Sequence, residues 1–111
     1  MINLDSIIKA YNDEFGDSLV EILLYGSYAR GDYNDDSDID IAGIVKGERA
    51  DLQQKEKVIW KAANALGLEN DVIVSPIVIP YDEYEAYKNE LPYYRNIMNE
   101  GIRLDHPEKW N

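Results

Sequence analysis

The chain has 111 residues, 45% of them hydrophobic, which suits one domain with one hydrophobic core. It has no cysteine, which excludes disulfide frameworks and thiolate zinc sites, and its 22 acidic against 11 basic residues give a formal net charge of −11. So acidic a chain repels phosphate backbones, which argues against direct nucleic-acid binding and suits a basic protein partner. No apolar run approaches the ~20 residues that span a bilayer, and no signal-peptide pattern is present. We expect one cytoplasmic domain over residues 1–111, without membrane contact.

Short runs of apolar and β-branched residues predict three strands. They are expected at residues 19–25, 38–45 and 71–79. The first run ends abruptly at Gly26. Pro76 lies inside the third run and has no N–H for a strand partner, so we expect this strand at a sheet edge or with a bulge.

Apolar residues at helical spacing predict four helices, and one further helical turn is expected after the first strand. The expected segments are 4–15, 28–30, 52–66, 81–87 and 92–100. Asp5 or Ser6 is expected to cap the first helix, and Gly67 is expected to end the helix over 52–66. Pro92 suits the first position of the last helix. The order of elements predicts an α/β or α+β domain with a small sheet flanked by helices.

Asp38 and Asp40 carry the first chemical signal. Side chains alternate faces along a strand, so these two carboxylates point one way while Ile39 and Ile41 point into the core. At ~3.3 Å per residue the two Cα atoms of the aspartates lie ~6.6 Å apart. Their oxygens can therefore converge on a metal pair ~3.5–4 Å apart, as in two-metal phosphoryl chemistry. Magnesium prefers such hard oxygen ligands, and a cation explains why two anions share an apolar strand.

The same acidic segment has two other interpretations. A solvated loop running into a strand is the commonest meaning of an isolated Asp-x-Asp pair. A calcium loop would use Asp36, Asp38 and Asp40 as its first three ligands. It would also need glycine at the position of Ile41 and glutamate at that of Gly47, so the calcium loop is excluded.

The Gly26-Ser27 turn, directly after the first predicted strand, is the second signal. Glycine permits a sharp turn and close approach to a ligand. The serine adds a hydroxyl beside backbone N–H groups, which attract polyphosphates. No Gly-Lys-Ser/Thr follows, so the turn is not a P-loop. Alone such a pair is usually a plain turn, but with the two aspartates it predicts a phosphate site.

Together these motifs resemble the signature of the DNA polymerase beta-like nucleotidyltransferase superfamily, and more narrowly its minimal nucleotidyltransferase (MNT) proteins. The family pattern is matched by Gly26-Ser27, Ala29-Arg30-Gly31 and Ser37-Asp38-Ile39-Asp40. Residues 96–104 are similar to the ending common in that group. The resemblance implies a small mixed sheet flanked by helices. It also implies transfer of a nucleoside monophosphate from a triphosphate to a hydroxyl.

The resemblance further implies roles for individual residues. Asp38 and Asp40 would hold two Mg²⁺ ions, with ATP as the substrate. A third carboxylate is implied on a neighbouring strand, and Asp71 is our prediction for it; Glu69 is the alternative, and a surface role for Asp71 is also open. The implied nucleotide-binding residues are Gly26, Ser27 and Arg30. The guanidinium of the last is equally expected to pair with a nearby aspartate.

Minimal members of this family act beside a partner. Many resemble MntA-type antitoxins that are paired with HEPN-type ribonuclease toxins, and the antitoxin is thought to adenylylate a tyrosine of the toxin. This function is our leading hypothesis for the chain. Two alternatives stay open: an antitoxin that neutralises its toxin by binding alone, and a small-molecule nucleotidyltransferase of the aminoglycoside-modifying kind.

Overall fold

The computed structural model describes residues 2–105, and its strands form one mixed sheet in the order β3-β2-β1-β4. The strands are β1 (Leu19–Tyr25), β2 (Ile39–Val45), β3 (Val74–Pro80) and β4 (Ile102–Arg103). β1 is antiparallel to both β2 and β4, whereas β2 and β3 are parallel. The predicted small mixed sheet is confirmed. The fourth strand was not predicted, because two residues are too few to show a period.

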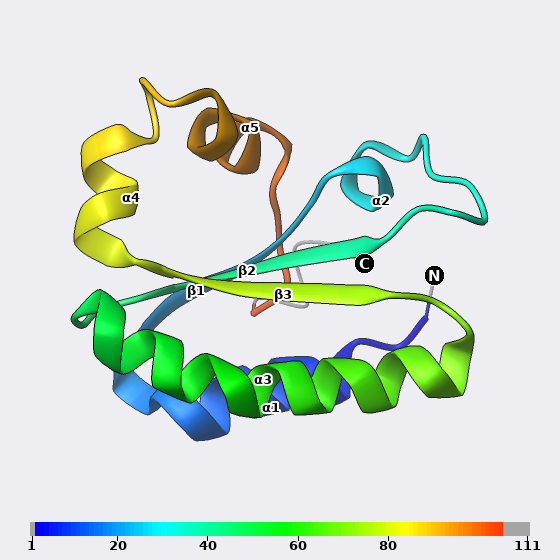
Figure 1. Ribbon diagram of the computed structural model, residues 1–111. Helices are drawn as coiled ribbons and strands as arrows, with labels where there is room; N and C mark the ends of the chain where they lie inside the picture. Colours follow the sequence, from blue (N-terminus) through cyan, green and yellow to red (C-terminus); the bar gives the residue numbers. More distant parts are fainter. Residues whose placement is uncertain (1, 106–111) are drawn as a thin grey trace.

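Helices cover both faces of the sheet (Figure 1). They are α1 (Asp5–Phe15), α2 (Ser27–Arg30), α3 (Arg49–Asn70), α4 (Tyr81–Tyr87) and α5 (Pro92–Glu100), with a 3-10 turn η1 (Gly16–Ser18). α1 and α3 lie on one face of the sheet and α4 and α5 on the other, and α2 sits at one end of the sheet (Figure 1). Among the described residues, no helix is both long and apolar enough to cross a membrane.

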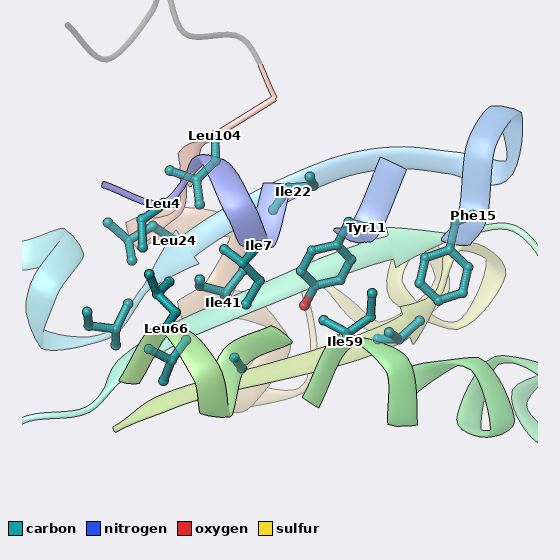
Figure 2. Packing of buried hydrophobic residues seen from close by; sticks show 14 of the residues in the cluster. Leu4, Ile7, Tyr11, Phe15, Ile22, Leu24, Ile41, Ile59, Leu66 and Leu104 are labelled. Atoms are coloured by element: carbon teal, nitrogen blue, oxygen red, sulfur yellow. The ribbon is translucent and has the colours of Figure 1, made fainter. Parts of the chain in front are cut away.

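The larger core lies between the sheet and the pair α1 and α3 (Figure 2). Tyr11 of α1 is fully buried there and donates a hydrogen bond to the Ile77 carbonyl at 2.9 Å. Its ring passes beneath Gly43, where an added Cβ would lie 2.4 Å from the ring. A glycine in β2 therefore makes room for the tyrosine that ties α1 to β3.

The position of β3 at the sheet edge confirms the expectation drawn from Pro76. An edge strand leaves backbone groups without a strand partner. The Val78 N–H donates instead to the Glu56 side chain of α3 at 3.0 Å. A proline and a side-chain acceptor thus restrict pairing with another strand at this edge.

Two predicted helix ends are wrong. The N-cap of α1 is Leu4, and the Asp5 N–H donates to the Asn3 side chain at 2.8 Å, so neither predicted residue caps this helix. α3 continues past Gly67 and ends with Asp71 in a left-handed conformation at φ 53°. The glycine serves packing instead, because a Cβ there would lie 2.4 Å from a backbone oxygen of the returning chain.

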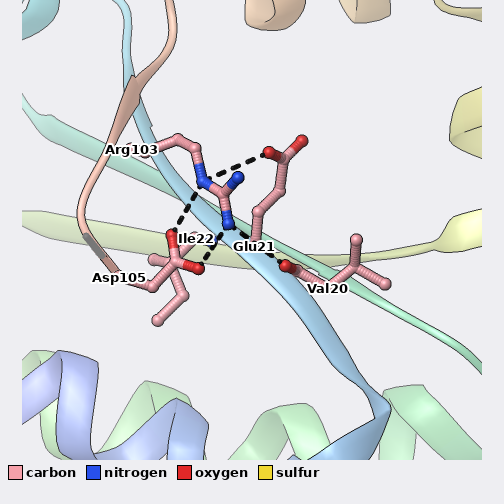
Figure 3. A network of polar contacts seen from close by, with 5 residues as sticks. All are labelled: Val20, Glu21, Ile22, Arg103 and Asp105. Atoms are coloured by element: carbon pink, nitrogen blue, oxygen red, sulfur yellow. Dashed lines mark hydrogen bonds and ion pairs between the residues drawn. The ribbon is translucent and has the colours of Figure 1, made fainter. Parts of the chain in front are cut away.

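The end of the described chain is tied to β1 by a polar network (Figure 3). Arg103 of β4 pairs with Asp105 at 2.8 Å and with Glu21 at 3.5 Å. Asp105 also accepts a hydrogen bond from the Ile22 N–H at 3.2 Å. The segment 96–104 therefore belongs to the fold, as the end of α5 and as β4.

Candidate active site

The two predicted halves of the site meet at one end of the sheet. Tyr25, the last residue of β1, is the register partner of Asp40 in β2. The chain then turns through Gly26, whose φ of 76° lies in the left-handed region. A Cβ on this glycine would lie 2.5 Å from Asp40 Oδ2. The phosphate-type turn therefore lies directly against the carboxylate, and only glycine permits that approach.

The predicted alternation is confirmed for Ile39, Asp40 and Ile41 of β2. Ile39 and Ile41 are fully buried in the core beneath α1 and α3. Asp40 lies on the opposite face, which it shares with Ala42 and the core beneath α4 and α5. Asp38 immediately precedes the strand and is half-buried. The sheet thus buries the isoleucines and presents the carboxylates at the end where the helical cover stops.

The electrostatics of the site favour a bound cation. Partial burial, followed by repulsion from the Asp38 carboxylate, raises the pKa of Asp40, while the Arg30 guanidinium acts in the opposite direction. Asp40 is therefore easier to protonate than an isolated aspartate. A divalent ion between hard carboxylate oxygens would relieve the same repulsion, so this donor set fits magnesium.

Arg30 ends α2 and extends toward the same region. It donates to Asp32 at 3.1 Å and to Glu100 of α5 at 2.8 Å. Of the two roles expected for this guanidinium, pairing with a nearby aspartate is the one observed. Ser27 begins α2 directly after the glycine, and its carbonyl accepts the Gly31 N–H at 2.9 Å. Of the three predicted nucleotide-binding residues, Gly26 lies against Asp40 and Arg30 acts on it through its charge.

Asp71 does not open a strand, contrary to the prediction. It ends α3 three residues before β3, and it lines a pocket of about 350 Å³ together with Asp38. Glu69, the alternative, lines a different pocket beside Ser6. Within residues 2–105, no group of three His, Cys, Asp or Glu side chains is placed to hold a metal. Burial and then charge repulsion from Asp38 raise the pKa of Asp40, so the two aspartates are coupled by that repulsion.

Ser75 is a site residue that the sequence did not reveal. It is the register partner of Asp40 in β3, as Tyr25 is in β1, and it is half-buried. The third strand was predicted to begin at residue 71 but begins at Val74, and its register with β2 depends on contacts far apart in sequence. A serine therefore occupies the β3 position that pairs with Asp40, whereas the third carboxylate was predicted at Asp71.

Comparison with known proteins supports this description. The family model described as "Nucleotidyltransferase domain" matches residues 4–104. "Putative protein adenylyltransferase MJ0141" of Methanocaldococcus jannaschii is 36% identical over 92 residues, covering 79% of this chain and 91% of the relative. A second protein of that organism, "Putative protein adenylyltransferase MJ0604", is 31% identical over 98 residues, covering 88% of this chain and 90% of the relative.

Solved structures show the same fold. A crystal structure of a toxin–antitoxin with AMP-PNP has a TM-score of 0.56 at 23% identity, covering 93% of this chain and 73% of that one. A mutant MntA–HpeT toxin–antitoxin structure has a TM-score of 0.55 at 23% identity, covering 94% and 72%. Three findings agree on the family: the fold, the family model that covers almost the whole described chain, and the relatives above 30% identity. This chain belongs to the nucleotidyltransferase domain family.

Proposed function

We propose that the protein transfers AMP from ATP, with magnesium, to a tyrosine hydroxyl of a HEPN-type ribonuclease toxin, and so acts as a cytoplasmic antitoxin. The observation that carries this proposal is the contact between the Gly26 turn and Asp40, where a Cβ would lie 2.5 Å from a carboxylate oxygen. A phosphate-type turn and a metal-type carboxylate share one site. Phosphoryl transfer needs little else from a protein, because it depends on positioning and charge neutralisation.

Each site residue receives a proposed role. Asp38 and Asp40 would hold two magnesium ions, and bound magnesium would neutralise charge on the nucleotide phosphates. Ser27 would contact the triphosphate together with the glycine before it. Asp71 is our proposed third carboxylate and proton acceptor, supported by the pocket that it shares with Asp38. Arg30 is exposed in its ion pairs, so its guanidinium is accessible to a phosphate.

Three observations support a protein acceptor within a toxin–antitoxin pair. The two Methanocaldococcus jannaschii relatives carry the name "Putative protein adenylyltransferase". Proteins with this fold have been solved as toxin–antitoxin complexes, one of them with AMP-PNP. The net charge of −11 is complementary to a basic, RNA-binding toxin.

A binding-only antitoxin is the second candidate. It is favoured by Ser75, because a neutral side chain beside Asp40 leaves the strand face of the site with fewer anionic ligands. Such a protein would neutralise its toxin by covering it, and its carboxylates would be dispensable for protection.

The deciding experiment measures magnesium-dependent transfer of labelled ATP to the co-purified partner. The test variant is Asp38→Asn/Asp40→Asn, and the matched control is Asp17→Asn/Asp82→Asn, which removes two exposed carboxylates elsewhere. We expect label on the partner with wild type and control, and a loss of more than about 10²-fold with the test variant. If the test variant loses labelling and still protects cells from the toxin, catalysis is not the basis of neutralisation. If a folded wild-type complex adds no label, the transferase proposal fails.

A further inference from the structure

A pair of hydrogen-bonded tyrosine hydroxyls lies on the sheet face that also carries Asp40. Tyr25 Oη and Tyr93 Oη are 2.8 Å apart, and their rings pack edge to face with centroids 6.1 Å apart. Tyr25 is the register partner of Asp40 and lies on the same sheet face. The Asp40 charge contributes to raising the pKa of Tyr25, after burial and the bond to Tyr93. A chain of neighbours therefore leads from Asp40 to Tyr93, at the start of α5.

The two tyrosines differ in their exposure. Tyr25 is only 8% exposed and is part of the core beneath α4 and α5, so its hydroxyl is held in place. Tyr93 is 54% exposed and is not among the core residues. Rotation about its side-chain torsions would break the hydrogen bond to Tyr25 and the edge contacts with the Tyr25 and Tyr94 rings. Tyr93 is thus the more exposed phenol of the pair.

Other tyrosines are less suitable acceptors. Tyr11 and Tyr84 are buried, and Tyr94 donates to the Glu83 carboxylate. Tyr28 packs against the core on the opposite face of the sheet and stacks on Tyr33 with ring centroids 4.1 Å apart. Tyr81 and Tyr87 belong to α4, which begins after Pro80, the register partner of Val45 at the end of β2 remote from Asp40. Tyr93 of α5 is therefore the exposed phenol that we consider.

We propose that Tyr93 is an internal acceptor, so that the protein adenylylates itself on this residue. The inference rests on the proposed function, because it uses the same nucleotide and the same carboxylates. In the reaction Tyr93 Oη forms a bond to the α-phosphorus of ATP, and the bond from that phosphorus to the oxygen bridging to the β-phosphate breaks. Pyrophosphate leaves, and the phenolic proton passes to a site carboxylate and then to water. The acceptor and the carboxylates belong to one folded chain, so the step needs no encounter between two proteins.

The test uses the purified chain alone with ATP and magnesium, followed by intact mass and peptide mapping. We expect the added mass of one adenylyl group, located on Tyr93. Tyr93→Phe removes the hydroxyl and keeps the ring, so the adduct is expected to disappear. The matched control is Tyr87→Phe, because Tyr87 is similarly exposed (45%) but lies on α4. Asp38→Asn/Asp40→Asn is expected to abolish the adduct as well.

Concentration separates an internal acceptor from one on a second copy. The fraction modified per unit time is expected to stay constant over a hundredfold dilution. A rate that rises in proportion to protein concentration overturns the inference, and so does an adduct mapped to another residue. An unmodified chain that still labels its partner overturns the inference and leaves the proposed function intact. If neither the chain nor the partner is labelled, both fail.

Discussion

Gly26 is the residue on which the geometry of the site depends most directly. Its φ of 76° and ψ of −157° belong to a region that is essentially restricted to glycine, and its missing Cβ is what lets the turn lie against Asp40. Gly31 offers a comparison, since its φ is 87° but a Cβ there would meet nothing within 4 Å.

We expect Gly26→Ala to lower the free energy of unfolding by about 1–3 kcal/mol and adenylyl transfer by about 10²-fold, because the added Cβ displaces the Asp40 carboxylate. Gly31→Ala imposes backbone strain without that contact, so it should lower stability and leave transfer close to wild type. Urea unfolding and labelled-ATP transfer measure the two effects separately. Equal losses of transfer in both variants would show that strain alone accounts for the effect.

Asp40 gives a prediction about pH. Its pKa is raised in the folded protein, first by burial and then by Asp38. Below the unfolded-state pKa of about 3.9, the Asp40 side chain is protonated in both the folded and the unfolded protein. As the pH rises through the higher folded-state pKa, the folded protein loses the stability that protonated Asp40 contributed. We therefore expect Asp40→Asn to be more stable than wild type at pH 7 in EDTA, with a difference that vanishes in acid.

Urea unfolding at several pH values tests this expectation, with Asp36→Asn as the exposed-loop control. Magnesium at pH 7 should restore the stability of wild type and have little effect on Asp40→Asn, because a cation removes the repulsion between the two aspartates. A variant that is less stable than wild type at pH 7 in EDTA would contradict the argument.

At the scale of elements, β1, β2 and β3 determine which side chains meet. The antiparallel pair β1 and β2 brings the Gly26 turn to Asp40, and the parallel pair β2 and β3 places Ser75 on its other side. Asp71 reaches the region from the left-handed end of α3 instead. A third metal ligand could therefore come from position 75 in β3 or from Asp71 at the end of α3.

Metal binding without nucleotide distinguishes the contribution of position 75 from that of Asp71. We expect Ser75→Asp to tighten Mn²⁺ binding about tenfold, or roughly 1.4 kcal/mol, because it adds an anion beside Asp40. Ser75→Ala, which adds no charge, is the control. Asp71→Asn should weaken binding by a similar factor if our proposal for that residue is right. Calorimetry or Mn²⁺ resonance measures both, and unchanged affinity in Asp71→Asn would remove it from the site.

At the scale of the whole molecule, the dominant property is the net charge of −11 on 111 residues. Such an excess of like charge destabilises the compact state through self-repulsion. Salt screens the repulsion, since the Debye length falls from about 30 Å at 0.01 M to about 8 Å at 0.15 M.

We therefore expect NaCl at 0.15 M, compared with about 0.01 M, to raise the unfolding free energy by about 1 kcal/mol, or roughly 4–8 °C in the thermal midpoint. Magnesium chloride at matched ionic strength should add a further increase through Asp38 and Asp40. In the Asp38→Asn/Asp40→Asn variant only the screening effect should remain. Equal responses of this variant and wild type to magnesium would mean that the ion acts by screening alone.

The elements and the central motif were predictable because their signals are local. β1, β2 and α1 follow from hydrophobic periods, and Pro76 correctly indicated the edge strand. Asp40 could be assigned to the face opposite Ile39 and Ile41 because strand alternation depends only on spacing. The local signal at Gly67 was misleading. A glycine near a helix end predicts a cap, and the sequence does not show that the returning chain packs against this glycine.

The remaining features depend on contacts between segments far apart in sequence. That Ser75 rather than Asp71 is the neighbour of Asp40 follows from the register of a parallel pair, which packing determines. Tyr25 meets Tyr93 only because α5 lies over the end of β1. The sequence by itself therefore determined the family of the fold and predicted Asp38 and Asp40 as a carboxylate pair. The tertiary structure alone decided which side chains surround that pair, because the energy that selects a register or a helix position comes from burial across the whole core.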